Sequence, residues 1–345
     1  MPKGQGKGRH MENKIKILVT MPEGEVFRTF FSEENRSALE ALGDVEWNRG
    51  SSQFTPEELK ERLRGKNICV TGWGCTPLEE EILENAAELK LIAHTGGSVK
   101  PYVTDAVYDR GIRVVSGNKV FAESVAESVI AYALSALRDI PYYSRRLKEG
   151  HWPERFQNRG LLDRSVGIVG YGMISGYVVR MLQPFHNTIK VFSRHIKEQE
   201  LEKWGMQKAG LEEIFSCCDI ISIHSGMTKE NYHLITEDLL RSMKPGALLI
   251  NTARGAIIDE EALVRVLQEE DIYAVLDVYE TEPLPQGHPL TACERALLMP
   301  HMGGPTIDRR LAVTKAVMRD MARFLEGEEL DCEIDRAYAG KMSLF

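Results

Sequence analysis

The sequence predicts an α/β protein with two domains, each built on a parallel sheet flanked by helices. Three observations carry this prediction. The chain has 345 residues, which is long for a single hydrophobic core. Short runs rich in Ile and Val alternate with amphipathic stretches, as they do in βαβ units. One of these runs leads into a glycine-rich turn followed by a helical pattern, which is typical of doubly wound sheets.

Composition narrows the class of protein. The chain is 43% apolar and 27% charged, values of an ordinary soluble protein. Its net charge of −8 disfavours binding to nucleic acid. The six cysteines form no C-x-x-C pair and predict reduced thiols in the cytoplasm. No apolar run approaches the roughly 20 residues of a membrane span, so no membrane contact is expected.

The N-terminus is basic and rich in glycine, and no hydrophobic segment follows it. Residues 1–12 are therefore not expected to be a signal peptide, and we interpret them as a disordered leader or an expression remnant.

The first series of strands and helices follows this leader. Strands are expected at Ile15–Met21, Ile68–Thr71, Leu91–Thr95 and Ile112–Val115. Helical patterns at Pro56–Leu63 and Pro77–Ala86 lie between them. Such alternation predicts right-handed crossovers between parallel strands.

A second series begins near residue 165. Its six expected strands are Val166–Val169, Ile189–Phe192, Ile220–His224, Ala247–Asn251, Ala274–Val278 and Leu297–Met299. A helix at Ala122–Arg138, stopped by Pro141, precedes this series, and a helix at Arg309–Leu325 follows it. The chain is therefore expected to leave one domain, build the other and return. The predicted boundaries are 13–118 plus 306–345 for the first domain and 119–305 for the second.

The glycine-rich turn follows the strand Val166–Val169 and opens a helix that ends near Pro184. The predicted contacts with a dinucleotide are Gly170, Tyr171, Gly172, Met173 and Ile174. Glycines let the backbone approach a pyrophosphate, which the amides and dipole of a helix N-terminus attract. A strand before the turn and a helix after it favour this interpretation over a turn without a ligand.

The end of the next strand bears on the choice of cofactor. NAD enzymes usually place a carboxylate there for the ribose 2′-hydroxyl, but this chain has Ser193, Arg194 and His195. These side chains can donate to a 2′-phosphate, and Arg does so as a planar fork. NADP is therefore favoured over NAD. The alternative is that Arg194 and His195 only solvate a strand end.

Five spaced segments resemble the D-isomer-specific 2-hydroxyacid dehydrogenases, a family that includes phosphoglycerate dehydrogenases and glyoxylate/hydroxypyruvate reductases. They are Ser-Val-Ala-Glu at 124–127, Met-Lys-Pro-Gly at 243–246, Asn-Thr-Ala-Arg-Gly at 251–255, Leu-Asp-Val-Tyr-Glu-Thr-Glu-Pro at 276–283 and Met-Pro-His-Met-Gly-Gly at 299–304. The resemblance implies two Rossmann-like domains with the active-site cleft between them.

The resemblance assigns catalytic roles to three residues. It implies that Arg254 binds the substrate carboxylate and carbonyl, that Glu282 orients His301, and that His301 is the general acid/base. The chemistry agrees, because histidine titrates near working pH and a guanidinium holds a carboxylate bidentately. Each residue alone has an ordinary structural explanation. Together they all follow predicted strands, at the edge of the sheet where ligands bind.

Further site residues come from the same resemblance. Asp277 is expected to hold the nicotinamide carboxamide. The other predicted cofactor contacts are His224, Ser225 and Thr228 in the adenine loop, with Thr252 and Ala253 before Arg254. The adenine loop has Gly226 where the family usually has proline, so it is expected to be looser.

The first domain is expected to contribute Gly96, Gly97 and Ser98, whose backbone amides suit a carboxylate. Trp73 is expected beside them, and ordinary partial burial is its alternative explanation. The histidines lack metal-ligand spacing, so no metal site is predicted.

The sequence thus predicts an oxidoreductase that transfers a hydride between NAD(P)H and a small 2-oxo/2-hydroxy acid. A glyoxylate/hydroxypyruvate reductase and a short-form phosphoglycerate dehydrogenase both fit. No phosphate-binding cluster stands out in the first domain, which disfavours a phosphorylated substrate. The alternative is an NAD(H)-sensing protein, because the family also includes transcriptional corepressors.

The resemblance implies a homodimer that forms through the cofactor domain, with the segment around residues 138–159 at the interface. This segment contains Tyr142, Tyr143, Trp152 and Phe156, and such aromatic content is typical of interfaces. Packing within the chain is the alternative.

Overall fold

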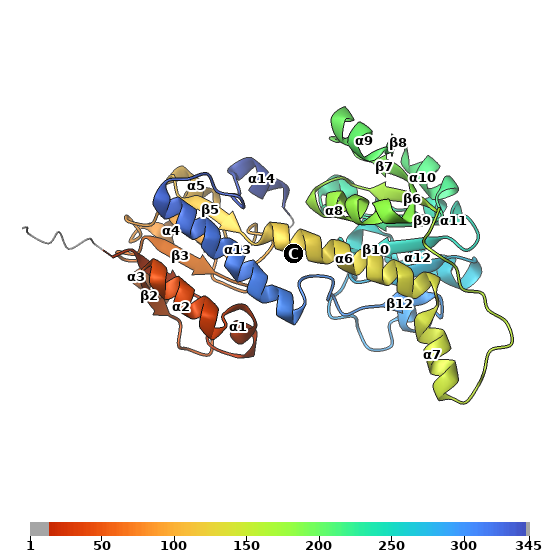
Figure 1. Ribbon diagram of the computed structural model, residues 1–345, viewed down its shortest axis with the longest axis horizontal. Coiled ribbons are helices and arrows are strands. Elements are labelled where there is room, and N and C mark those ends of the chain that lie inside the picture. The colour runs from red at the N-terminus through yellow and green to blue at the C-terminus, as the bar shows by residue number, and fades with distance from the viewer. Residues whose placement is uncertain (1–13, 343–345) are drawn as a thin grey trace, which may run out of the picture. The chain divides into compact units, whose positions relative to one another are not determined.

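A computed structural model describes residues 14–342, and the predicted leader lies outside this range. The chain divides into two compact units (Figure 1). The first unit runs to Asn118 and resumes at Arg310, and the second runs from Lys119 to Arg309. The return to the first unit thus comes four residues later than residue 306, where the sequence analysis placed it.

The first unit is a parallel sheet with the strand order β2-β1-β3-β4-β5 among the described residues. Its strands are β1 (Lys16–Val19), β2 (Asp44–Trp47), β3 (Ile68–Thr71), β4 (Leu91–His94) and β5 (Arg113–Ser116). Its helices are α1 (Glu25–Phe30), α2 (Glu33–Leu42), α3 (Pro56–Arg62), α4 (Glu80–Leu83), α5 (Asp105–Asp109) and α14 (Arg336–Lys341), and α13 (Ile307–Glu326) returns the chain to this unit.

The sequence analysis missed β2. This strand lies at the edge of the sheet and reads Asp-Val-Glu-Trp, with only Trp47 buried. Edge strands carry charged residues because one side of the ladder meets water. The pattern therefore lacks the continuous apolar run that marks β1, β3 and β4, whose inner residues are buried.

The second unit is a larger parallel sheet. Its described strands follow the order β12-β11-β10-β9-β6-β7-β8. They are β6 (Ser165–Val169), β7 (Thr188–Phe192), β8 (Gln207–Lys208), β9 (Ile220–Ile223), β10 (Leu248–Asn251), β11 (Tyr273–Leu276) and β12 (Ala296–Leu298). The order reverses beside β6, and in doubly wound sheets ligands bind at such a switch point, outside the carboxyl ends of the strands. The predicted fold class is confirmed.

Helices cover both faces of this sheet. The α-helices are α6 (Asn118–Leu137), α7 (Ile140–Lys148), α8 (Met173–Leu182), α9 (Glu198–Trp204), α10 (Leu211–Cys217), α11 (Glu237–Arg241) and α12 (Glu260–Glu269). The short 3-10 helices are η1 (Gln183–Phe185), η2 (Lys229–Asn231), η3 (Gly255–Ile257) and η4 (Pro289–Ala292). Phe215 of α10 and Leu263 of α12 pack with Leu249 on one face. Val129 of α6 and Val178 of α8 pack with Ile250 on the other.

Helix α6 is long and apolar enough to cross a membrane by length and composition. The same test is passed by core helices of soluble proteins. Ala126, Val129 and Ala133 of α6 are buried against the sheet of the second unit, so packing within the protein accounts for its apolar character.

Pro141 was predicted to stop the preceding helix, but it lies in the first turn of α7. The break comes earlier, after Leu137, and Asp139 adopts a left-handed conformation with φ of 53°. Proline is tolerated in the first turn of a helix because the amide it lacks would have no partner there.

Several strands end one or two residues before the apolar run does. The predicted ends Met21, Thr95, His224, Val278 and Met299 all lie outside the observed strands. These residues belong to the loops that leave the carboxyl edges of the two sheets, where the predicted site residues also lie.

Candidate active site

The three predicted catalytic residues lie at one edge of the second unit. Arg254 follows β10, Glu282 follows β11 and His301 follows β12. These strands are parallel neighbours in the sheet. Their carboxyl ends therefore bring the three loops to the same side.

His301 and Glu282 form a close pair. Nδ1 of His301 lies 2.6 Å from Oε2 of Glu282. The other carboxylate oxygen accepts a hydrogen bond from the backbone N–H of Tyr279 at 3.0 Å. In the described part of the chain no group bonds to Nε2 of His301, and the side chain is 49% exposed. Glu282 thus fixes the ring through one nitrogen and leaves the other available to a substrate.

Arg254 lies in a less exposed place than His301. Its Nη1 donates to the carbonyl of Ala253, and its Nε is buried without a hydrogen-bond partner among the described residues. Burial lowers the pKa of Arg254, and the charge of Glu282 opposes that shift. An arginine is still charged near neutral pH. Arg254 therefore places a positive charge and an unused buried N–H donor at this edge of the sheet. A carboxylate is the group that such a donor suits.

Close packing holds the Arg254 loop in place. A Cβ added at Gly255 would lie 1.9 Å from the carbonyl carbon of Tyr279, so only glycine permits this approach. Asn251 accepts from the amide of Ala253 and donates to the carbonyl of Arg254. The loop that presents Arg254 is thereby fixed against the loop that leads to Glu282.

Asp277 was expected to hold the nicotinamide carboxamide. Its buried carboxylate accepts hydrogen bonds from the amides of Met302 and Gly303, both at 2.8 Å, and from the hydroxyl of Tyr132 at 3.3 Å. These bonds anchor the residues directly after His301. A carboxylate has about four acceptor positions, so contact with the carboxamide stays a prediction.

The glycine turn contains two glycines with different roles. Gly170 has a φ of +95°, and a Cβ there would lie 2.6 Å from the amide nitrogen of Ser225. It is needed for close contact with the loop that begins at His224. A Cβ at Gly172 would meet nothing within 4 Å, so open space lies beside the N-terminus of α8.

The second unit also has the features that a dinucleotide requires. The first residues of α8 are Met173 and Ile174, and the amides at a helix N-terminus attract a pyrophosphate. Oγ1 of Thr252, at the end of β10, is buried without a partner in the described structure. The open space at Gly172 and this unused hydroxyl fit a bound dinucleotide. Ala253 is the next residue and is half-buried.

The end of β7 presents the three residues on which the cofactor prediction rests. Arg194 reaches Oδ1 of Asn231 at 3.4 Å, so its guanidinium lies towards the segment that contains Thr228. Oγ of Ser193 accepts from the amide of His195 at 3.3 Å. No acid stands at the strand end itself.

An acid does approach this region from another element, which the sequence analysis missed. Glu200 of α9 accepts a hydrogen bond from the hydroxyl of Tyr171 at 2.9 Å. Glu200 was missed because it lies on the following helix and not at the strand end. In the adenine loop, burial lowers the pKa of His224 to about 4, and its Nε2 lies 2.8 Å from Oγ of Ser222.

In the first unit, the residues predicted to contact substrate lie in the loops after β3 and β4. A Cβ added at Gly72 would lie 3.4 Å from Oγ1 of Thr95, so the loop of Trp73 lies beside the loop of Gly96, Gly97 and Ser98. A Cβ at Gly96 would lie 2.2 Å from Nε2 of His94. Glycine is therefore required where this loop crosses a buried imidazole.

Arg310 is a second residue that the sequence analysis missed. Its guanidinium carbon lies 5.1 Å from the ring centre of Trp73 and 5.7 Å from that of Phe30. Its Nε is buried without a partner, and it forms no ion pair with a carboxylate in the described chain. The only signal in the sequence was the pair Arg309-Arg310 near the start of a helix. Trp73 itself is 39% exposed.

No group of three or more His, Cys, Asp or Glu side chains within residues 14–342 is arranged to hold a metal ion.

Known proteins resemble this chain over most of its length. Residues 130–303 match the family model described as "D-isomer specific 2-hydroxyacid dehydrogenase, NAD binding domain". A glyoxylate reductase of Thermofilum pendens is 33% identical over 283 residues, which cover 79% of this chain and 82% of that protein. A D-3-phosphoglycerate dehydrogenase of Methanocaldococcus jannaschii is 32% identical over 317 residues. This chain spans 58% of that longer protein, and the match covers 91% of this chain.

The fold is also shared with solved structures. A protein from Thermus thermophilus is 30% identical, with a TM-score of 0.73, over 93% of this chain and all of that one. The motifs that suggested the family, the fold and these relatives agree. The chain belongs to the D-isomer-specific 2-hydroxyacid dehydrogenases and is a nicotinamide-dependent oxidoreductase.

Proposed function

We propose that the protein reduces a small 2-oxo acid to the D-2-hydroxy acid, as a reductase of the glyoxylate/hydroxypyruvate type. The observation that carries this proposal is the 2.6 Å His301–Glu282 pair at the same sheet edge as Arg254 with its unused buried donor. The relatives named glyoxylate reductase support the substrate class.

Arg254 binds the substrate carboxylate and polarises the adjacent carbonyl, so it orients the substrate and stabilises negative charge on the oxygen. The reduced nicotinamide supplies the hydride to the carbonyl carbon when it is bound. His301 donates the proton from Nε2 to the oxygen that becomes the hydroxyl. Glu282 fixes the ring and its tautomer through Nδ1. In the reverse direction His301 accepts the proton.

We propose NADP as the preferred cofactor. Ser193, Arg194 and His195 supply donors and positive charge at the end of β7, and none of them repels a 2′-phosphate. Glu200 lies on the neighbouring helix but is already bonded to Tyr171. Michaelis constants for NADPH and NADH with one substrate test this proposal. A lower constant for NADH in the wild type, unchanged in Arg194→Gln, would contradict it.

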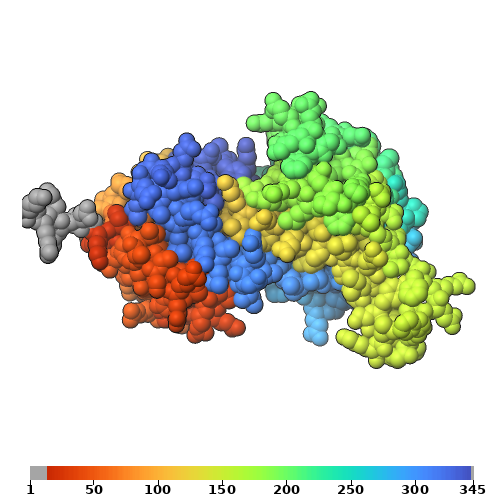
Figure 2. Space-filling view, in the orientation of Figure 1, coloured from red at the N-terminus to blue at the C-terminus, as the bar shows by residue number. Residues whose placement is uncertain are grey.

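We also propose a homodimer formed through α7 and the segment that follows it. Figure 2 shows this segment as the yellow-green surface of the second unit. Several of its apolar side chains are exposed, including Trp152 at 78% and Phe156 at 64%. Large exposed aromatics are typical of interfaces. Light scattering on the full chain should give the mass of two chains, and Trp152→Ser with Phe156→Ser should give the mass of one.

A cytoplasmic location remains our proposal. Cys69, Cys75, Cys217, Cys218 and Cys293 form no disulfide within the described residues, as is usual in a reducing compartment.

The enzyme proposal is tested by the consumption of NADPH and NADH with glyoxylate, hydroxypyruvate, phosphohydroxypyruvate, pyruvate and 2-oxoglutarate. Turnover with glyoxylate or hydroxypyruvate supports it. Tight cofactor binding without turnover of any 2-oxo acid would instead favour the NAD(H)-sensing alternative.

A further inference from the structure

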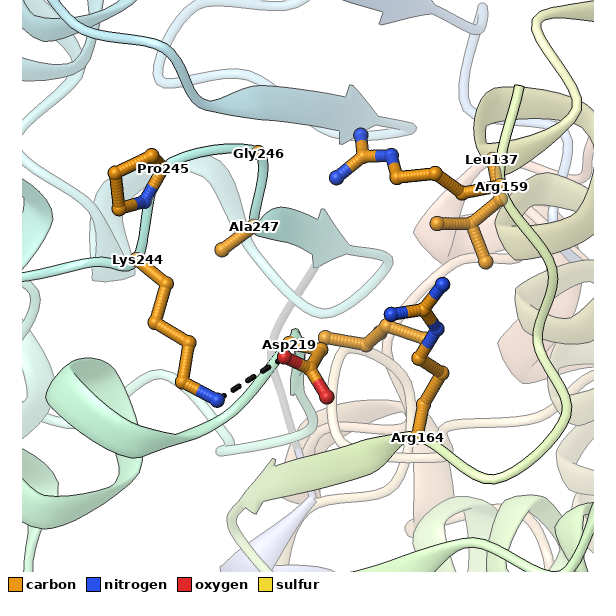
Figure 3. A pocket seen from close by; sticks show the side chains of 9 residues that line it. Leu137, Arg159, Arg164, Asp219, Lys244, Pro245, Gly246 and Ala247 are labelled. Atoms are coloured by element: carbon orange, nitrogen blue, oxygen red, sulfur yellow. Dashed lines mark hydrogen bonds and ion pairs between the residues drawn. The ribbon is translucent and has the colours of Figure 1, made fainter. Parts of the chain in front are cut away.

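A second charged site lies at the opposite edge of the seven-stranded sheet. Arg164, Asp219 and Ala247 directly precede β6, β9 and β10, whereas the active-site residues follow their strands. Together with Arg159 and Lys244 they line a pocket of about 140 Å³ (Figure 3). This volume is several times the roughly 30 Å³ that one water molecule occupies in the liquid. The pocket can therefore hold a small ion.

The pocket has an excess of positive charge. Three cations, Arg159, Arg164 and Lys244, line it with a single carboxylate, Asp219. Lys244 pairs with Asp219 at 3.0 Å. Neither arginine forms an ion pair with any carboxylate in the described chain. Two positive charges thus lack an ion pair, although the carboxylate of Asp139 lies within Coulombic range of Arg159.

Both guanidinium groups are held in place without a carboxylate. The guanidinium carbon of Arg159 lies 4.8 Å from the ring centre of Tyr273. A Cβ added at Gly246 would lie 2.6 Å from Nη1 of Arg159. Gly246 has a φ of +77°, so glycine is favoured there for its backbone as well as for the space it leaves. Arg164 donates from Nε to the carbonyl of Gly160 at 3.0 Å. This bond leaves its two terminal nitrogens for another partner.

Figure 3 shows the terminal groups of both arginines turned towards the pocket. Two like charges in a partly enclosed space repel each other, and a shared anion removes that repulsion. Guanidinium groups match the oxygens of a phosphate and bind them bidentately. A carboxylate would satisfy one guanidinium but supplies a single negative charge, whereas a phosphate close to neutral pH supplies nearly two.

We propose that this pocket binds a phosphate group, as inorganic phosphate or as the phosphate of a small monoester, through Arg159 and Arg164. The site is separate from the dinucleotide and substrate sites because it lies at the amino ends of the strands. Arg159 belongs to the segment that follows α7, so a bound phosphate ties this segment to the sheet.

The test is titration calorimetry with inorganic phosphate on the full chain saturated with NADPH, whose own phosphates keep inorganic phosphate out of the dinucleotide site. The wild type is expected to bind one phosphate per chain. Arg159→Gln with Arg164→Gln should weaken binding at least tenfold. The matched control is Arg155→Gln, an exposed arginine on the same segment, which should bind as the wild type does. Glycerol phosphate in place of phosphate distinguishes a monoester site from one that takes only the free ion.

Three further measurements keep the outcome clear. Arg254→Ala should still bind phosphate, because that residue belongs to the other edge, so a failure of the proposed enzyme activity leaves this result unaffected. Thermal unfolding with and without phosphate shows whether the double variant folds. Arg164→Lys, which keeps the charge but loses the fork, should bind with intermediate affinity.

Three outcomes would overturn the proposal. They are no phosphate binding by the wild type, equal binding by the folded double variant, and loss of binding in Arg254→Ala. If phosphate does not bind and light scattering shows that the double variant has lost a partner copy, the arginines serve contact between chains.

Discussion

The loops at the carboxyl edges of the two sheets carry different chemistry. In the second unit, these loops carry Arg254 and the His301–Glu282 pair, which is joined at 2.6 Å. In the first unit, the corresponding loops carry glycines and an aromatic ring, Trp73, against which Arg310 of α13 packs. Under the proposed function, the second unit supplies the groups for proton transfer, while the first shapes the space around a substrate.

Among the residues of the second-unit loops, Arg254 should have one of the largest effects on catalytic activity when it is replaced. Arg254→Ala removes the group that binds the carboxylate and stabilises charge on the carbonyl oxygen, so kcat/KM should fall about 10³-fold. Steady-state rates of NADPH oxidation with hydroxypyruvate measure this. Arg155→Gln, on an exposed arginine, is the control for loss of positive charge. A kcat/KM near that of the wild type would refute the assignment.

Glu282→Gln should have a smaller effect than removal of His301 or Arg254. The amide of Gln can accept a hydrogen bond from Nδ1 or donate one to it, so it no longer fixes the tautomer of the ring, and kcat should fall roughly 10- to 100-fold. Steady-state rates of NADPH oxidation measure this. A kcat equal to that of the wild type would show that Glu282 does not position His301.

Replacement of Arg310 tests whether the first unit contributes to substrate binding. Arg310→Gln should leave kcat within about threefold and raise KM about tenfold for a 2-oxo acid that carries a second anionic group. Phosphohydroxypyruvate, which carries the second anionic group, and hydroxypyruvate, which lacks it, are the matched pair of substrates. Arg319→Gln, on the same helix, controls for loss of a charge. Equal effects on both substrates would assign Arg310 to packing with Trp73 and Phe30 alone.

Replacement of His94 tests how a buried imidazole below the first-unit loops affects the free energy of unfolding. Burial lowers its pKa to about 3, and Thr71 lies 2.9 Å from its Nδ1. The unfolded chain takes up a proton at this residue near pH 6.5 and the folded chain does not. The free energy of unfolding should therefore fall as pH falls from about 6.5 towards 3, by about 1.4 kcal/mol per pH unit from this group.

Urea unfolding of the wild type and His94→Gln at pH 7 and pH 5 isolates this contribution. The wild type should lose about 2 kcal/mol more than the variant over that interval. His151→Gln, at an exposed histidine, is the control. An equal loss in wild type and His94→Gln would show that His94 does not stay neutral in the folded chain.

Much of the second unit could be predicted from sequence, because its central strands β6, β9 and β10 are buried and its motifs lie at the ends of strands. The triad Arg254, Glu282 and His301 is brought to one edge as expected. The edge strand Asp44–Trp47 was missed because its charged residues break the apolar run. Contacts between distant segments carry no local signal, which is why Glu200 on Tyr171 and Arg310 on Trp73 were not foreseen.

The hydrogen-bond partners of Asp277 could not be predicted for a different reason. Its position at a strand end was predicted correctly, but its hydrogen bonds to the amides of Met302 and Gly303 depend on how a distant loop folds back. Residue type and spacing do not contain that information. The same holds for Gly170, whose close neighbour is Ser225.

We propose that the His301–Glu282 pair supplies the proton for reduction of a 2-oxo acid. The most direct measurement follows absorbance of NADPH and NADH with glyoxylate and hydroxypyruvate, for wild type and His301→Gln. We expect turnover by the wild type and a loss of about 10²- to 10⁴-fold in kcat in the variant, with cofactor affinity retained. Equal rates in the two proteins, or no turnover by a wild type that binds cofactor, would contradict the account.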